Sequence, residues 1–251
     1  MTYRLPKVSR ISDHTFFDHL LCRNEAVIVD LGMNNGDFSR QVRGLHPNVT
    51  IFGCEPVPSL HKKLSAEFGS SALNLAVAGK TEDGQITLYD DYCPSMVLDG
   101  LGECSNGAVP TQVVSLDDLV DRLKIKHIDL LKVDIESSEL AMILNASAGT
   151  LGRCDQITVE FHDWLDPGHL LGIRSCILRL QTSGFEVFRC SISSYSDVLF
   201  VRKRFIRSIA AKAIMWAAIA FKTVNYTKAR NFLGRTFRTR AGRATGATAH
   251  T

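Results

Sequence analysis

Several features that would point to familiar protein classes are missing from this chain. Its seven cysteines include no Cys-x-x-Cys pair, which argues against a zinc site and against a disulfide framework. The first residues, MTYRLPKVSRISDH, contain no apolar segment of the kind that a secretory signal needs. We therefore expect a cytoplasmic protein whose cysteines serve as small buried hydrophobic side chains.

Acidic residues are missing from the last part of the chain. Residues 202–251 contain 12 lysines and arginines and no acid, whereas residues 1–201 contain 17 basic residues and all 26 acidic ones. The small net charge of +3 therefore conceals an acidic body and a basic end. We divide the chain into a body, residues 1–201, and a basic helical extension, residues 202–251.

Strand-like and helix-like segments alternate along the body. The apolar runs AVIVDLG (26–32) and VTIFGCEP (49–56) are typical of strands in a parallel sheet, and the segment between them has helical spacing. Further strands are predicted at 72–79, 85–90, 127–134, 154–161, 185–190 and 197–203, and the Gly-, Ser- and Asn-rich stretch from Cys93 to Pro110 is expected to be an irregular loop or lid. This alternation predicts an α/β fold with a doubly wound, mostly parallel sheet.

An acid stands at the end of four of the predicted strands: Asp30, Glu55, Asp134 and Glu160. In doubly wound sheets, ligands bind at the carboxyl ends of the strands. The four carboxylates are therefore expected to gather at one edge of the sheet as a binding or catalytic site.

The turn after the first apolar run reads Asp30-x-Gly32-x-x-x-Gly36, which is not the G-x-G-x-x-G fingerprint of dinucleotide-binding proteins. An acid at the strand end suits a ligand with a cationic amino group, and Glu55 suits the hydroxyls of a ribose. S-adenosylmethionine has both features. The alternative is that the glycines only form a tight turn and the acids only cap helices.

The motifs VIVDLGMNNGDFS, IFGCEP, VVSLDDLV, IDLLKVDIESSEL and ITVEFH occur in an order and spacing that resemble the FkbM-type S-adenosylmethionine-dependent methyltransferase family. The resemblance extends over about residues 25–165. It implies a seven-stranded class I methyltransferase (Rossmann-like) fold and O-methylation of a sugar, a glycolipid or a related natural product. One departure is Ser137, which stands where the family pattern has glycine.

The resemblance also implies roles for individual residues. It places Asp30, Gly32, Asn34 and Gly36 around the methionine part of the cofactor. It places Glu55 at the ribose and the stretch from Asn74 to Ala76 near the adenine. It places Asp134 and Glu136 at the floor where methyl donor and acceptor meet, with Glu160 and His162 facing them.

Methyl transfer to a hydroxyl requires positioning of the two reactants and removal of the hydroxyl proton. His162 is the first candidate for the base because imidazole titrates near neutrality, and Glu136 is the second. A purely structural role for His162 is the alternative. Glu139 is expected to serve the helix dipole, and a divalent metal held by Asp134, Glu160 and His162 is an open hypothesis that rests on spacing alone.

The basic extension contains the segment RKRFIRSIAAKAIMWAAIAFK, which has helical character. Its longest uncharged stretch, 213–221, is shorter than the roughly 20 residues that a bilayer-spanning helix needs. We expect residues 203–240 to bind the anionic inner membrane surface. The alternative is a helix packed on the body or in a dimer interface.

Two other functions fit parts of the sequence. A nucleic-acid methyltransferase could use the basic end to bind phosphates, but its body would not be expected to be acidic. A non-catalytic cofactor-binding module is the second alternative, suggested by Ser137. The acceptor itself cannot be read from the motifs, because the loop expected to select it, 93–110, has no recognisable pattern.

Overall fold

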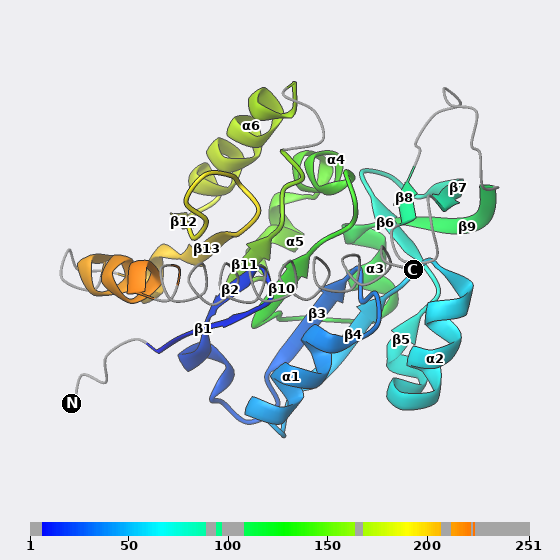
Figure 1. The fold of residues 1–251 in the computed structure, drawn as a ribbon, viewed down its shortest axis with the longest axis horizontal. Helices are drawn as coiled ribbons and strands as arrows, with labels where there is room; N and C mark the ends of the chain where they lie inside the picture. The colour runs from blue at the N-terminus through cyan, green and yellow to red at the C-terminus, as the bar shows by residue number, and fades with distance from the viewer. Residues whose placement is uncertain are drawn as a thin grey trace, which may run out of the picture.

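The computed structural model describes residues 7–88, 94–96, 108–163, 168–206, 212–221 and 223. Its centre is a seven-stranded sheet (Figure 1). In spatial order the strands are β12 (Phe185–Arg189), β13 (Val198–Arg202), β11 (Gln156–Val159), β10 (Leu130–Val133), β3 (Val27–Leu31), β4 (Thr50–Cys54) and β5 (Ala72–Leu73). The strands from β11 to β5 are parallel, and β13 runs antiparallel to both of its neighbours. The predicted α/β class and mostly parallel seven-stranded sheet are confirmed.

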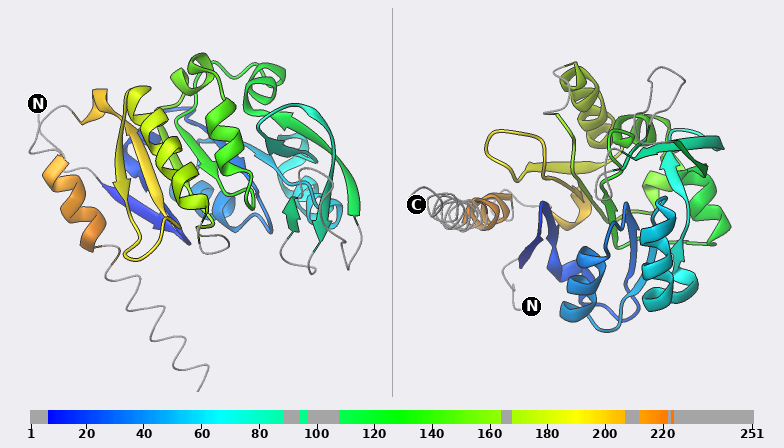
Figure 2. Two further views of the ribbon diagram at one scale, coloured as in Figure 1. Left: turned by 90° about the horizontal axis from the view of Figure 1, so that it is seen from above. Right: turned by 45° about the vertical axis from the view of Figure 1, so that its right-hand side comes forward.

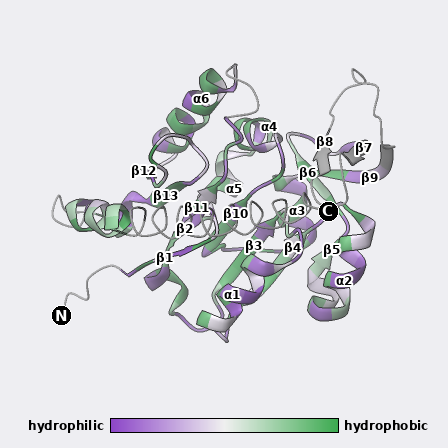
Figure 3. Cartoon of the chain, in the orientation of Figure 1, coloured by the Kyte–Doolittle hydropathy of each residue, from purple (hydrophilic) through white to green (hydrophobic). Residues whose placement is uncertain are grey.

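Successive residues of each buried strand point to opposite sides of the sheet, so both faces are apolar. Both faces are covered by other elements. On one face Ile28 and Leu130 pack with Phe38 and Val42 of α1 (Asp37–Leu45). The N-terminal hairpin of β1 (Val8–Ile11) and β2 (His14–Phe17), with the short η1 (Asp18–Leu21), lies on this side too. The opposite face packs against α3 (Leu116–Arg122), α4 (Glu139–Asn145), α5 (Ala148–Gly152) and α6 (His169–Thr182). The hydropathy colouring shows the hydrophobic character of the central strands (Figure 3).

A second, four-stranded sheet lies beyond β5 and has the order β6 (Ala76–Ala78), β9 (Ala108–Ser115), β7 (Glu82–Leu88) and β8 (Pro94–Met96). The single strand expected at 72–79 is therefore two strands that belong to different sheets. The prediction of an irregular segment from Cys93 to Pro110 is wrong for 94–96 and 108–110, which pair with β7; residues 97–107 lie outside the described ranges. The helix α2 (Pro58–Phe68) and the short η2 (Gly69–Ser71) precede β5.

Helical residues 212–221 lie at the β12–β13 end of the molecule, away from the four-stranded sheet (Figure 2). Met215 and Ile219 are buried against Phe188, Leu199 and Val201, and the short η3 (Lys203–Phe205) connects this region to β13. These contacts attach the helix to the body, which is the alternative that the sequence left open. Within the described ranges, no helix combines the length and the apolar character that crossing a bilayer requires. The division at residue 201 and membrane binding stay predictions, and residues 224–251 lie outside the described ranges.

Candidate active site

The turn between β3 and α1 is held against the ends of its neighbouring strands. The N–H groups of Gly32 and Met33 both donate to the carbonyl of Cys54, at 3.0 and 2.9 Å. Gly32 has a φ of +79°, and a Cβ at this position would lie 1.8 Å from the carbonyl oxygen of Asp134. Glycine is therefore required here by the close approach of the Asp134 backbone, before any ligand is considered.

Glu55 is fixed by two backbone N–H groups at the end of β4. Its Oε2 accepts from Asn34 at 2.7 Å and its Oε1 from Val57 at 2.9 Å. Burial raises the pKa of this carboxyl to about 7, although both hydrogen bonds act to lower it. Glu55 is thus an oriented acceptor that lines a pocket and is shielded from water.

One pocket collects residues from the carboxyl ends of β3, β4 and β10 and from the β5–β6 region. Six of the residues predicted to form the site line it: Gly32, Asn34, Glu55, Ala76, Asp134 and Glu136. Its remaining walls are mostly apolar and come from Cys54, Pro56, Leu60, Leu75, Val77 and Ile135. The pocket therefore combines apolar walls with carboxylates at Glu55, Asp134 and Glu136.

Three residues predicted to contact the cofactor do not line this pocket. Asp30 is fully buried, where it accepts from Ser39 Oγ at 2.6 Å and lies 3.2 Å from Lys132 Nζ. The side-chain amide of Asn74 donates to the carbonyls of Glu55 and Pro56, so it holds the backbone of the pocket wall. Gly36, with a φ of +86°, is the N-cap of α1, and a Cβ there would lie 2.7 Å from Leu64 Cδ2. These residues support the pocket from outside its surface.

The segment after β10 turns sharply and aims three carboxylates toward His162. The Nε2 of His162 lies 3.2 Å from Glu136 Oε2 and 3.8 Å from Asp134 Oδ1, and the Nδ1 of His162 lies 3.1 Å from Glu139 Oε1. Glu139 is buried and also accepts the N–H groups of Ile135 and Ser137. Glu139 begins α4, as a helix-dipole role requires, but it also fixes the turn and the imidazole, which sequence reasoning did not predict.

The charges around His162 change its chemistry. Burial lowers the pKa of the imidazole, but the hydrogen bond that His162 donates to Glu139 and the charges of Glu139, Glu136 and Asp134 outweigh burial and raise the pKa to about 9. A protonated imidazole has no free lone pair at neutral pH. The geometry therefore favours His162 as a donor that orients Glu136, and Glu136, whose pKa burial raises above the ordinary value, as the better candidate for the base.

Lys132 lies buried beneath the carboxylates. Its ammonium is 3.2 Å from Asp30 Oδ1 and 3.3 Å from Asp134 Oδ2, and it also donates to the carbonyl of Gly32. Burial acts to lower its pKa, but these two acids raise it well above the usual value. Burial would raise the pKa of Asp134, but Lys132 and the two neighbouring histidines, His14 and His162, hold that pKa well below its usual range. Lys132 is therefore the cationic partner of Asp30 and Asp134.

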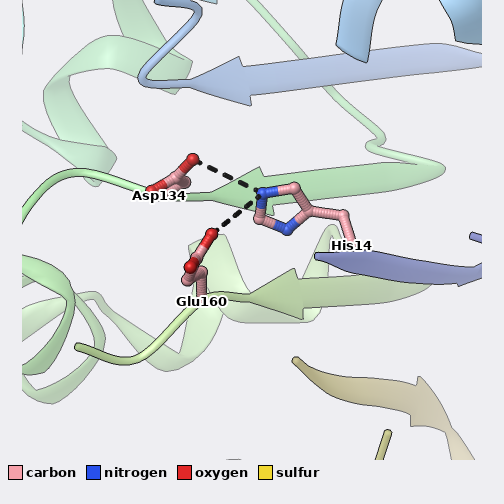
Figure 4. Close-up of side chains that lie close together, drawn as sticks. All are labelled: His14, Asp134 and Glu160. Carbon is pink, nitrogen blue, oxygen red and sulfur yellow. Dashed lines mark ion pairs between the residues drawn. The ribbon is translucent and has the colours of Figure 1, made fainter. Parts of the chain in front are cut away.

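His14 was missed by the sequence analysis. It lies on β2 and points at the ends of β10 and β11, with its Nε2 3.5 Å from Asp134 Oδ2 and 3.9 Å from Glu160 Oε2 (Figure 4). Burial and the charge of Asp134 raise the pKa of Glu160 to about 8. No motif could have revealed His14, because the hairpin precedes the recognised segments and reaches the site only through tertiary packing.

Asp134, Glu160 and His162, the residues predicted to hold a divalent metal, do not bring their possible ligand atoms together at one point. Asp134 is instead shared between two sets, His14–Asp134–Glu160 and Asp134–Glu136–His162. A third set, His127, Asp129 and Asp155, is engaged by the guanidinium groups of Arg23 and Arg204.

The comparison with known families identifies the protein class. A model described as the methyltransferase FkbM domain matches residues 30–180, which run from the end of β3 into α6. The chain belongs to the FkbM methyltransferase family. Of the site residues described above, only His14 lies outside the matched segment.

Two curated relatives of this FkbM methyltransferase are similar over different lengths. The AMB antimetabolite synthetase AmbE of Pseudomonas aeruginosa is 24% identical over 254 residues, covering 81% of this chain and 12% of the relative. The 31-O-demethyl-FK506 methyltransferase FkbM of Streptomyces tacrolimicus is 26% identical over 175 residues, covering 55% of this chain and 65% of the relative. The chain thus spans less than two thirds of either relative. Among solved structures, human methyltransferase-like protein 13 in complex with SAH aligns with 14% identity over 82% of this chain and 88% of that chain, at a TM-score of 0.41.

The pocket of this FkbM methyltransferase fits S-adenosylmethionine, the cofactor that membership of the family implies. Glu55 offers oriented carboxylate oxygens to ribose hydroxyls, and the apolar walls at Leu60, Leu75 and Val77 suit a flat base. Asp134 lines the same pocket and suits the cationic sulfonium and amino groups.

Proposed function

We propose that this methyltransferase transfers the methyl group of S-adenosylmethionine to a hydroxyl group of a sugar, a glycolipid or a related natural product. The observation that supports the proposal is the position of Glu136, which lines the cofactor pocket and is oriented by His162 at 3.2 Å. The relative from Streptomyces tacrolimicus, named for a 31-O-demethyl-FK506 substrate, supports oxygen as the acceptor atom.

The roles of the residues follow from their surroundings. S-adenosylmethionine supplies a methyl group on a positively charged sulfur. Glu55 binds the ribose hydroxyls, and Asp134, kept ionised by Lys132, provides negative charge on the pocket floor. Glu136 accepts the proton of the acceptor hydroxyl, and His162, held by Glu139, fixes the orientation of Glu136.

The test is methyl transfer to panels of hydroxylated sugars, glycolipids and polyketide-type products, followed by formation of S-adenosylhomocysteine and by mass spectrometry of the product. Glu136→Gln should lower turnover by about 10²- to 10⁴-fold with little change in cofactor affinity, because a general base acts on the acceptor and not on the cofactor. His162→Gln should lower turnover less. Glu67→Gln, on the exposed surface of α2, is the matched control and should keep wild-type turnover.

Three outcomes would contradict the proposal. A product methylated on nitrogen or carbon would exclude the acceptor class. Wild-type turnover in Glu136→Gln would remove Glu136 from the chemistry, and cofactor binding without turnover on any hydroxyl compound would favour the non-catalytic module.

We also infer that the enzyme meets its acceptor at the anionic inner surface of the membrane. The attached helix exposes Trp216 and Phe221, and Ile192 is exposed on the adjacent β12–β13 loop. The basic residues of the extension add attraction to anionic lipid, which is worth about 1 kcal/mol for each Lys or Arg near the surface.

A further inference from the structure

His14 is a buried histidine with an incomplete set of hydrogen bonds. Its side chain is only 3% exposed, and its Nδ1 has no hydrogen-bond partner in the described part of the chain. Its Nε2 points between the carboxylates of Asp134 and Glu160 (Figure 4). A buried imidazole with one orphan nitrogen costs free energy, so the other nitrogen is expected to make a strong interaction.

The distances do not describe good hydrogen bonds. The separations of 3.5 and 3.9 Å from Nε2 to Asp134 Oδ2 and Glu160 Oε2 exceed the usual N–H···O length of about 2.9 Å. Atoms bound to one cation at roughly 2.1 Å lie about 3 to 4 Å from each other. The two distances from His14 Nε2 therefore match the spacing of ligands around a common ion, and one ligand atom from each of the three residues lies within 4.8 Å of the others.

The neighbouring set with His162 is a weaker metal site. Both ring nitrogens of His162 are already engaged, Nδ1 by Glu139 at 3.1 Å and Nε2 by Glu136 at 3.2 Å. A metal ligand must offer a free lone pair, so His162 would first have to give up one of these bonds. His14 has no such competing bond at Nε2.

The local charge also favours a cation. The connected group contains five carboxylates, of Asp30, Asp134, Glu136, Glu139 and Glu160, against one lysine and two histidines. Lys132 approaches Asp134 Oδ2 at 3.3 Å, but it is also bound to Asp30 and to the carbonyl of Gly32. Its single charge is thus shared by two acids, and the carboxyls of this group outnumber its cationic side chains.

We propose that His14 Nε2, Asp134 Oδ2 and Glu160 Oε2 bind a divalent cation, with Mg²⁺ or Mn²⁺ the best match for one imidazole and two carboxylates. The hairpin of β1 and β2 then has a function, since it supplies the ligand that lies outside the segment matched by the family model. Binding of the cation does not depend on the proposed function. Its use does: a cation that coordinates the acceptor hydroxyl lowers the pKa of that hydroxyl, and the released proton passes to Glu136.

The experiment is a calorimetric titration of metal-free full-length protein with MnCl₂, with the electron paramagnetic resonance signal of free Mn²⁺ as a second readout. Wild type should bind one Mn²⁺ per chain. His14→Gln should weaken this binding at least about tenfold. Mutation of residues that only hydrogen-bond to metal ligands already lowers metal affinity about 10- to 100-fold. His162→Gln and His127→Gln are matched controls, one in the neighbouring set and one in the distant set, and both should keep wild-type affinity.

Glu160→Gln provides a second ligand variant if His14→Gln does not fold, and thermal unfolding identifies folded variants. Equal Mn²⁺ affinity in wild type and in the folded ligand variants would overturn the proposal, as would loss of binding in His162→Gln with retention in His14→Gln. Binding of S-adenosylmethionine, measured on the same samples without metal, separates this result from a failure of the proposed function.

Discussion

At Ser137 the backbone adopts a φ of +79°, directly after Glu136 with a φ of +48°. Conformations of this kind cost a residue with a Cβ roughly 1 to 2 kcal/mol, whereas glycine adopts them freely. The position where the family pattern has glycine is therefore a strained turn in this protein. Glu139 stabilises this conformation, because it accepts the N–H groups of Ile135 and Ser137 on either side of Glu136.

We expect Ser137→Gly to raise the free energy of unfolding by about 1 kcal/mol, because glycine removes the cost of the positive φ. Ser175→Gly is the matched control. Ser175 is exposed within α6, where glycine should lower stability by roughly 0.5 to 1 kcal/mol. Urea unfolding measures both, and a loss of stability in Ser137→Gly would show that the turn is not strained.

Residues in the motifs were predictable and residues brought in by tertiary contacts were not. Glu55 and Asp134 stand at strand ends within apolar runs, so their place at the sheet edge followed from the fold class. His14 and the second role of Glu139 depend on how the hairpin and α4 pack, and no periodic pattern encodes this packing. At Gly32 the backbone of Asp134 already excludes a Cβ, and this close approach depends on tertiary packing that the local pattern does not encode.

At the scale of elements, the attached helix has two faces with different surroundings. Met215 is 1% exposed and packs on the core, whereas Trp216 is 46% exposed and Phe221 69% exposed. Trp216 also contacts the ring of Phe188, with centroids 5.2 Å apart. The buried face explains why the helix belongs with the body, and the exposed face is the part available to a membrane.

We expect Met215→Ala to lower the free energy of unfolding by about 2 to 5 kcal/mol, as large-to-small changes in a core do. Phe221→Ala should change stability by less than about 0.5 kcal/mol but should weaken sedimentation of the protein with anionic vesicles at low salt. Neutral vesicles are the control for charge. If Phe221→Ala and Trp216→Ala both sediment as wild type does, the exposed face does not bind membrane.

The strands illustrate what element-level patterns can and cannot specify. Apolar runs predicted β3, β4, β10 and β11 in order. Ser115 caps α3, where its side chain accepts from the Asp118 N–H. The run at 72–79 gave no sign that Asn74 separates two strands, because its local pattern is equally compatible with one strand.

At the scale of the whole molecule, the strand order determines where the site lies. Because β4, β3, β10 and β11 are adjacent and parallel, their carboxyl ends place Glu55, Asp30, Asp134 and Glu160 along one edge. The central claim is that the pocket at this edge binds S-adenosylmethionine, with Glu55 as the acceptor for the ribose hydroxyls.

Glu55 gives this binding a pH dependence. Its pKa of about 7 means that the carboxyl is mostly protonated at pH 6 and mostly ionised at pH 8. Hydroxyl donors bind the ionised form more strongly. Affinity for the cofactor should therefore increase from pH 6 to pH 8 in wild type, and the increase should be smaller in Glu55→Gln, which cannot ionise.

The most direct measurement is calorimetric titration of the full-length protein with S-adenosylmethionine at pH 8. We predict one cofactor per chain, at least about tenfold weaker binding in Glu55→Gln because hydrogen bonds to a charged group are lost, and unchanged binding in Glu67→Gln. Absence of binding in folded wild type, or equal affinity in wild type and Glu55→Gln, would contradict the account.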